Sequence, residues 1–126
     1  MNRIDAQTTL NDRIGDEVVV HALDPTGRAL LSLHGELLHW SHQEHGSMLD
    51  LRLFSSVIQQ LEACYRIGDR GYLDLPDDDD IEFSDFRPDP DRGPLAVGLD
   101  VRYPSGSLVR VVWAEGPSKF TLGAGR

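Results

Sequence analysis

The chain has little with which to build covalent cross-links, membrane spans or a secretion signal. Its 126 residues include one cysteine, which excludes an internal disulfide and with it the usual framework of a small secreted domain. No window approaches the roughly 18 consecutive apolar residues that a membrane helix requires. The first residues also lack the apolar stretch of a signal peptide. We therefore expect a cytoplasmic protein.

The motifs of several common enzyme classes are missing too. The sequence contains no G-x-S-x-G elbow, no G-x-x-x-x-G-K-[ST] phosphate loop and no G-x-G-x-x-G fingerprint. Cys64 falls among apolar residues, where a free cysteine behaves as a small buried hydrophobe. We predict no catalytic site and no cofactor, so the protein is not expected to be an enzyme.

Positive charge is scarce relative to negative charge. Twelve Lys and Arg residues face 21 Asp and Glu residues, for a formal net charge of −9, and Lys119 is the single lysine. This balance argues against nucleic acids and anionic membranes as partners, because their phosphates would repel the protein. Between Asp69 and Asp91, ten acidic residues against two basic ones leave a net charge of −8.

The acidic run has three readings. Asp77, Asp78, Asp79 and Asp80 are consecutive, and their mutual repulsion predicts an exposed loop; the first reading is a solvated loop kept apart from a strand edge. Together with Glu82 and Asp85, these residues are instead candidates for docking a basic partner, since such charge raises association rates and specificity. A calcium loop of the EF-hand type fails, because Glu82 stands where that motif requires glycine.

The organisation indicates a single domain over residues 1–126, in which residues 1–16 form a loose arm. A β-branched run at 17–23 and an apolar run at 29–40 flank Asp24-Pro25-Thr26-Gly27, which predicts a hairpin with a break or bulge at Gly35. Strict alternation predicts strands at 48–53 and 95–103. Shorter strands are predicted at 72–75, 81–86, 108–113 and 120–122.

One segment has helical spacing. Its apolar residues follow steps of three and four; they are Phe54, Val57, Ile58, Leu61, Cys64 and Tyr65. Ser56 and Gln59 fit a capping box, and Gly68 fits a helix end. The expected fold is α+β and mostly β: an antiparallel β-sandwich or half-barrel with a single α-helix at about residues 55–66.

Three histidines recur every third residue beside a tryptophan. His39, His42 and His45 are weak candidates for a zinc site, for a polar connecting loop or for a pH-sensitive contact patch. The segment lies between two predicted strands and lacks a closing fourth ligand, which favours the loop. Trp40 and Trp113 are predicted in the core, and Trp40 is also a candidate anchor for a partner.

The order of elements from Leu49 onward resembles that of a known family. The strand Leu49–Leu53, the helix Phe54–Glu62, the segment Gly68-Asp69-Arg70-Gly71 and paired C-terminal strands around Gly106 carry the likeness. This pattern is similar to the WapI-like immunity proteins of bacterial polymorphic-toxin systems and to related uncharacterised actinobacterial domains. The resemblance implies a non-enzymatic protein that binds and blocks a toxin, and many such toxins are basic nucleases.

We therefore expect a protein-binding module, an immunity or inhibitor protein that neutralises a basic toxin. Asp77–Asp80, Glu82 and Asp85 would attract the partner, and Trp40 would anchor it. Two alternatives remain open: a small-molecule or metal-binding domain that uses His39, His42 and His45, and a structural homodimer.

Overall fold

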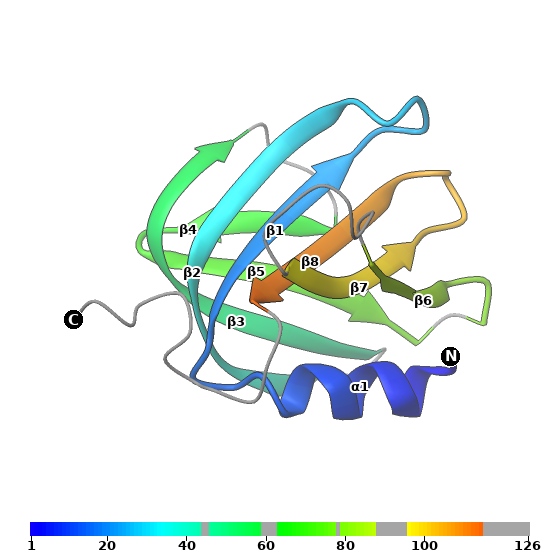
Figure 1. Ribbon diagram of the computed structural model, residues 1–126, viewed down its shortest axis with the longest axis horizontal. Helices are drawn as coiled ribbons and strands as arrows, with labels where there is room; N and C mark the ends of the chain where they lie inside the picture. The colour runs from blue at the N-terminus through cyan, green and yellow to red at the C-terminus, as the bar shows by residue number, and fades with distance from the viewer. Residues whose placement is uncertain (44–45, 59–62, 78, 88–95, 115–126) are drawn as a thin grey trace.

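The backbone runs through one helix and eight strands in the part of the chain that the structure describes (Figure 1). The structure is a computed structural model that describes residues 1–43, 46–58, 63–77, 79–87 and 96–114. The elements are α1 (Arg3–Asn11), β1 (Glu17–Leu23), β2 (Ala29–Gln43), β3 (Gly46–Ile58), β4 (Cys64–Ile67), β5 (Arg70–Pro76), β6 (Glu82–Phe86), β7 (Ala96–Arg102) and β8 (Leu108–Ala114).

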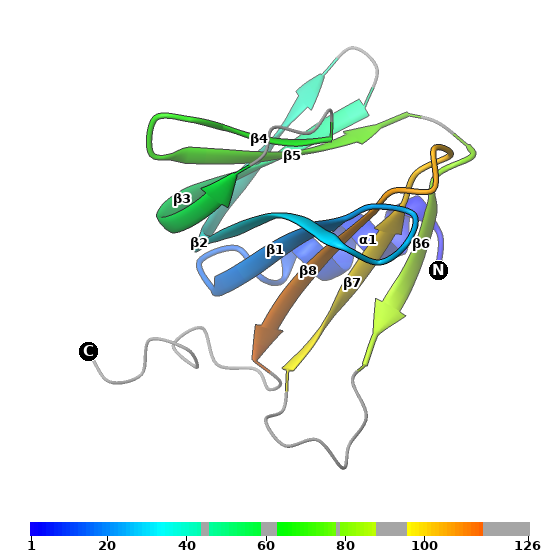
Figure 2. The same cartoon turned by 90° about the horizontal axis from the view of Figure 1, so that it is seen from above.

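All eight strands form one antiparallel sheet. Their order is β4-β5-β3-β2-β1-β8-β7-β6, so β4 and β6 are its two edges. Figure 2 shows the sheet bent into two halves, with β3, β4 and β5 in one and β6, β7 and β8 in the other. The predicted fold, mostly β with antiparallel strands and a single helix among the described residues, is confirmed. Of the two predicted forms, the open bent sheet corresponds to the half-barrel.

Alternate residues of the strands form the core. In β1, Val18, Val20 and Ala22 are buried, whereas the residues between them are half-buried. In β5, Leu73 and Leu75 repeat the pattern. Because successive strand side chains point to opposite faces, this alternation assigns one face of the sheet to the interior.

The predicted hairpin between β1 and β2 is confirmed. The two strands pair antiparallel, and Gly27 adopts a φ of 89°, which favours glycine. The Asp24 carboxylate accepts hydrogen bonds from the backbone N–H of Thr26 at 2.9 Å and of Arg28 at 3.0 Å. The turn is therefore closed by its own aspartate.

The bulge predicted at Gly35 is also present. The register between β2 and β3 shifts between His34 and Gly35. A Cβ atom at Gly35 would lie 2.2 Å from the carbonyl oxygen of Arg52. The close approach of the two backbones therefore requires glycine here.

The helix predicted at about residues 55–66 is wrong. β3 and β4 occupy the described part of this segment, and residues 59–62 lie outside the described residues. Phe54, the first residue of the expected apolar helix face, is 50% exposed on β3. Gly68, expected to end the helix, lies in the turn between β4 and β5 with a φ of 61°. Register shifts in the β2–β3 pairing interrupt the strand alternation, so the apolar spacing imitates helical steps.

The loose arm predicted for residues 1–16 is wrong as well, because α1 forms there. The Asn2 side chain accepts a hydrogen bond from the Asp5 N–H at 2.8 Å, and the Asp5 carboxylate accepts one from the Asn2 N–H, which completes a capping box. Ala6 and Leu10 are fully buried in the hydrophobic core. Their burial fixes the helix to the sheet.

The other predicted strands have clear counterparts. Segments 72–75, 81–86, 95–103 and 108–113 coincide with most of β5, β6, β7 and β8. The strand predicted at 120–122 lies outside the described residues. Within the described ranges, no helix has the length and apolar character needed to cross a membrane.

Candidate functional site

Acidic side chains gather along β6 and the connection that leads into it. All the described members of the predicted acidic site are exposed, and we call them the acidic edge: Asp77, Asp79, Asp80, Glu82 and Asp85. Asp78 lies outside the described residues. The expected exposure of the aspartate run is thus confirmed for its described members.

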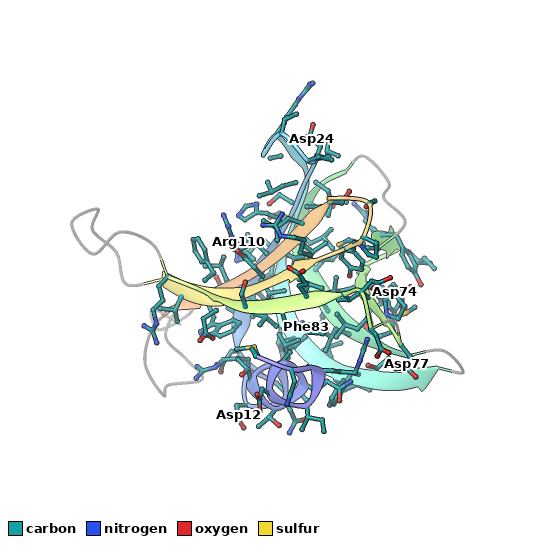
Figure 3. All side chains as sticks on the ribbon, turned by 90° about the vertical axis from the view of Figure 1, so that its right-hand side faces the viewer. Asp12, Asp24, Asp74, Asp77, Phe83 and Arg110 are labelled. Atoms are coloured by element: carbon teal, nitrogen blue, oxygen red, sulfur yellow. The ribbon has the colours of Figure 1, made fainter. Side chains whose placement is uncertain are left out.

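The acidic edge coincides with an edge of the sheet. β6 pairs with β7 on one side, and no described strand pairs with its other side. Glu82, Ser84 and Asp85 are exposed, whereas Phe83 is 8% exposed and points toward α1 (Figure 3). Charged side chains on an edge strand deter indiscriminate strand pairing, yet they leave the backbone donors and acceptors accessible to a matching chain.

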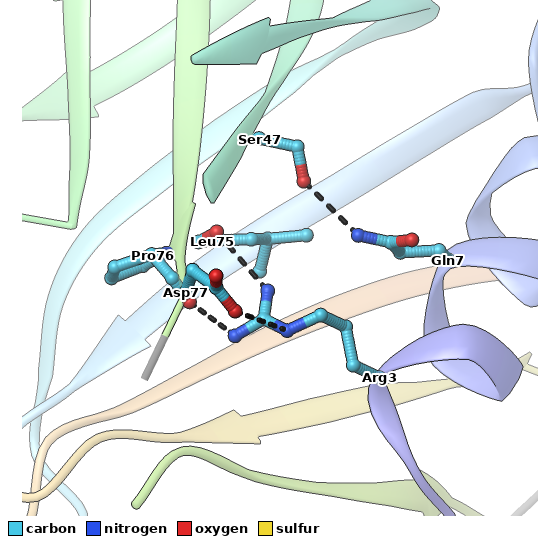
Figure 4. Close-up of polar contacts among 6 residues, drawn as sticks. All are labelled: Arg3, Gln7, Ser47, Leu75, Pro76 and Asp77. Atoms are coloured by element: carbon cyan, nitrogen blue, oxygen red, sulfur yellow. Dashed lines mark hydrogen bonds and ion pairs between the residues drawn. The ribbon is translucent and has the colours of Figure 1, made fainter. Parts of the chain in front are cut away.

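Arg3 of α1 braces the connection at the start of the acidic edge (Figure 4). Its guanidinium donates to the carbonyl oxygens of Leu75, at 3.2 Å, and of Pro76. Its Nε lies 3.9 Å from a carboxylate oxygen of Asp77, and its Cζ lies 5.5 Å from the centre of the Phe83 ring. A cation–aromatic contact and two hydrogen bonds to backbone therefore hold this end of β5.

The surface is hollowed beside Arg3. A hollow of about 420 Å³ is lined by Asn2 and Arg3 from the start of α1 and by Asp79, Glu82 and Phe83 from the acidic edge and β6. In the described part of the chain, Asp79, Glu82 and Asp85 form no ion pair. Asp79, Glu82 and Asp85 thus offer negative charge without an ion pair among the described residues, and Asp79 and Glu82 also line the hollow.

Trp40 is not exposed beside these acids. It is half-buried on β2 and packs against the hydrophobic core, as the alternative of a core residue predicts. In the strand order, β2 lies four positions from β6. Trp113, on β8, is 5% exposed and belongs to the core.

The described part of the histidine segment belongs to strands rather than to the connecting loop that the sequence favoured. His39 and His42 belong to β2, and His45 lies outside the described residues. His39 is 60% exposed, and its Nδ1 lies 3.5 Å from a carboxylate oxygen of Asp50. A search of the described residues finds no group of three or more His, Cys, Asp or Glu side chains placed to hold a metal ion.

Asp50 is a buried carboxylate that the sequence did not single out. It is 8% exposed on β3, and its Oδ2 accepts a hydrogen bond from Arg70 Nη1 at 2.7 Å. That bond, with the negative charge of Asp50, raises the pKa of Arg70. Its Oδ1 has no hydrogen-bond partner among the described residues. The side chains of His39 and Arg70, from two neighbouring strands, lie against this carboxylate.

Cys64 is as buried as predicted, with 0% of its surface exposed. Burial raises the pKa of its thiol to about 12. Since the thiolate is the reactive form, this environment keeps Cys64 inert at neutral pH.

Among the described residues, the acidic edge brings together the predicted acidic site residues beside Arg3 and the hollow, whereas Trp40 lies apart on β2. Arg3 escaped the sequence analysis because its partners lie more than seventy residues away along the chain. Comparisons of the chain with protein-family models, with curated proteins and with solved structures found no match.

Proposed function

We propose that this protein is a non-enzymatic binding module that captures a basic protein through the acidic edge. The particular role proposed is that of an immunity or inhibitor protein, which neutralises a basic toxin in the cytoplasm. The resemblance to the WapI-like immunity proteins supplies the kind of partner. The exposed acidic side chains at an open strand edge are the observation that carries the proposal.

Charge is the first contribution of the acidic edge. Glu82 and Asp85 stand on β6, and Asp79 lies just before it, without ion-pair partners among the described residues. A concentrated negative potential attracts a basic surface and orients it before contact. Electrostatic steering of this kind raises association rates by roughly 10- to 1,000-fold at low salt.

The open backbone of β6 is the second contribution. An extended segment of a partner can add to an exposed sheet edge, where main-chain hydrogen bonds give affinity and side chains give specificity. Glu82 and Asp85 lie on opposite faces of β6, so an extended segment with arginine or lysine on both of its faces would meet both when laid along β6. Self-association through the same edge is disfavoured, because two copies would oppose like charges.

Association kinetics test the proposal directly. The probe is a fluorescently labelled peptide that repeats Arg-Arg-Thr-Thr, which presents Arg on both faces of an extended chain, and a Glu-Glu-Thr-Thr repeat is the matched acidic control. Glu82→Gln combined with Asp85→Asn removes two charges from the acidic edge. Asp12→Asn combined with Asp69→Asn removes two exposed charges elsewhere. Asp77 is left unchanged because it pairs with Arg3.

We expect the edge variant to lower the association rate with the basic peptide by about tenfold at low salt, and the control variant to change it less than about twofold. Added salt should erase the difference. Equal rates for the two double variants, or equal binding of the acidic peptide, would overturn the acidic edge as the docking surface.

The immunity role has a separate test. The product of the neighbouring reading frame is expressed with and without this protein. A basic product that arrests growth, with relief by this protein and less relief by the edge variant, supports the role. A neighbouring product without toxicity, or relief that the edge variant leaves unchanged, contradicts it.

A further inference from the structure

A cavity lies away from the strand edge, where the two halves of the bent sheet approach each other. Figure 2 shows the end of β5 beside the turn between β7 and β8, and the Tyr103 hydroxyl joins them by a hydrogen bond of 2.5 Å to the Asp74 carbonyl oxygen. The cavity measures about 480 Å³, within the roughly 300–1,000 Å³ typical of small-molecule sites. No described residue of the acidic edge lines it.

The cavity has a buried apolar floor and an exposed rim. The floor consists of Ala22, Ile81, Leu108 and Val109, each of which is less than a tenth exposed. The rim includes Ser105, an exposed residue of the turn between β7 and β8. An apolar group that entered past this rim would leave water for the floor, and burial of apolar surface favours binding.

The turn between β7 and β8 forms a wall that is held in place before any ligand arrives. The Tyr103 N–H donates to the Ser107 carbonyl oxygen at 2.9 Å, and the Gly106 N–H donates to the Tyr103 carbonyl oxygen at 2.9 Å. The bond from the Tyr103 hydroxyl to Asp74 fixes the same wall to β5. A preformed wall of this kind lowers the entropic cost of binding.

Ser107 brings a hydrogen-bonding group to this wall. It lines the cavity and is half-buried, and its hydroxyl has no hydrogen-bond partner in the described part of the chain. Its backbone is already engaged, because the carbonyl oxygen accepts from Tyr103 and the N–H donates to Ser105 Oγ at 3.3 Å. A serine hydroxyl can both donate and accept, so it suits a ligand with one hydroxyl or carbonyl group.

The electrostatics of the cavity favour an uncharged ligand. No lysine or arginine is among the described lining residues, and Asp74, the one carboxylate among them, already has an interaction partner. Burial raises the pKa of Tyr103; the negative charge of Asp74 raises it further, whereas the positive charge of Arg3 lowers it. Charges of both signs therefore act on this wall. An ionised ligand would lose hydration here without a free counter-charge in the described lining.

We propose that this cavity binds a small uncharged molecule, whose apolar body rests on the floor formed by Ala22, Ile81, Leu108 and Val109 and whose single hydroxyl or carbonyl group bonds to the Ser107 hydroxyl. The site goes beyond the proposed capture of a basic protein. It uses a different surface and a different class of ligand, so either proposal can fail without the other.

Three matched probes test the class of ligand: 1-adamantanol, 1-adamantylamine and adamantane-1-carboxylate. They share one rigid apolar body and differ in the charge of a single polar group at neutral pH. Binding to the full chain is followed by calorimetry and by proton–nitrogen correlation spectra. We expect 1-adamantanol to shift the backbone amides of Ser105, Ser107 and Leu108 in a saturable way. The amine and the carboxylate should each bind at least about tenfold more weakly.

Two substitutions locate the site. Ser107→Ala keeps the backbone groups that close the turn and removes the hydroxyl, so it should weaken 1-adamantanol binding about fivefold. Ser84→Ala is the matched control, because it removes an exposed serine hydroxyl on β6, and it should leave the affinity unchanged. Ala63→Leu enlarges a residue of the lining and should weaken 1-adamantanol binding by occupying part of the cavity. Thermal unfolding of each variant checks that it is folded.

Binding of the amine or the carboxylate as tight as that of 1-adamantanol would overturn the proposal. So would an effect of Ser107→Ala no larger than that of Ser84→Ala, or an unchanged affinity in folded Ala63→Leu. Shifts centred on residues outside the cavity would overturn it too. The absence of saturable binding at the solubility limit of 1-adamantanol would also overturn it.

Discussion

The Tyr103 hydroxyl and the Asp74 carbonyl oxygen lie 2.5 Å apart and join two parts of the sheet that are not neighbours in the strand order. Tyr103 follows β7, whereas Asp74 is within β5. Burial raises the pKa of Tyr103, so its hydroxyl remains a donor at every physiological pH. This single bond spans the opening between the two halves of the sheet.

Removal of that bond should loosen the opening. Tyr103→Phe keeps the ring and leaves the Asp74 carbonyl without its donor, so the free energy of unfolding should fall by about 1–3 kcal/mol. Urea unfolding measures the change. Tyr72→Phe is the control, because the Tyr72 hydroxyl makes no hydrogen bond within the described residues. A loss at Tyr103 no larger than at Tyr72 would refute the bridging role.

The anchoring of α1 gives a second prediction. Arg3→Met retains an unbranched side chain that can pack like the aliphatic part of arginine. It removes the hydrogen bonds to Leu75 and Pro76 and the ion pair with Asp77. We expect a loss of about 1–3 kcal/mol of unfolding free energy. Faster amide hydrogen exchange in α1 should accompany it.

The matched variant for Arg3 is Arg28→Met, at an exposed turn residue whose side chain makes no hydrogen bond among the described residues. It should alter the unfolding free energy by less than about 0.5 kcal/mol. Unchanged exchange in α1 of Arg3→Met would show that Ala6 and Leu10 anchor the helix without help.

Cys64 should be chemically silent in the folded protein. Burial raises the pKa of its thiol to about 12 and leaves no exposed surface. A thiol-specific chromogenic reagent at mildly alkaline pH should therefore report no reactive thiol in buffer. It should report one equivalent in concentrated guanidinium chloride. Rapid reaction in buffer would show that β4, an edge strand, opens readily.

His21 should make stability depend on pH. Burial, with the positive charge of Arg110 as a second cause, lowers the pKa of His21 below 6.5. As the pH falls through 6.5, the unfolded chain takes up a proton at this residue, whereas the folded protein resists it until a lower pH. The free energy of unfolding therefore decreases on acidification across this window.

Comparison with His21→Asn isolates this effect from the many carboxylates. Above the ordinary pKa of 6.5, the difference in unfolding free energy between the parent protein and the variant should be constant. Below pH 6.5, the unfolding free energy of the parent should fall relative to that of the variant. Parallel curves from neutral to mildly acidic pH would contradict the assignment to His21.

The strands with one buried face could be predicted from the sequence. Val18, Val20 and Ala22 alternate with half-buried residues because the pleat turns every second side chain to the interior. Leu99 and Val101 repeat this pattern in β7. Local chemistry also identified the turn at residues 24–27 and the bulge at 35, where glycine meets a specific backbone demand.

The first half of β3 was predicted as a strand, but the part from Phe54 onward could not be separated from a helix by its spacing. Beyond the register shift opposite Gly35, Phe54 lies on the outer face, where its ring meets His34 at 5.4 Å between centroids and the Arg52 guanidinium at 5.6 Å. A prediction from apolar spacing counts an exposed aromatic residue such as Phe54 as if it were buried in the core. Only the pairing partner across the sheet resolves the ambiguity.

The sequence analysis missed α1 because this helix has too few apolar residues, whereas the segment after Phe54 has apolar residues at helical spacing. Few of its residues are buried, chiefly Ala6 and Leu10, and Ile4 is 72% exposed, so no apolar stripe marks the helix. A local pattern does indicate the start of α1: Asn2 and Asp5 have the spacing of a capping box, which the structure contains.

Exposure of the acidic edge could be predicted, because four adjacent aspartates repel one another. Its surroundings could not. The hydrogen bond from Arg3 to the Leu75 carbonyl and the one from Arg70 to the Asp50 carboxylate join residues from distant parts of the chain. Such pairings depend on strand order, which a single sequence does not specify.

The bond from Arg3 to Pro76 also bears on how the chain emerges during synthesis. The acceptor is made 73 residues after the donor. At roughly 5–20 residues per second, a ribosome takes about 4–15 s to bridge that interval. The bonds that secure the start of α1 can therefore form only after the end of β5 has been made. A nascent chain stalled before Pro76 would present α1 without this anchor to chaperones and proteases.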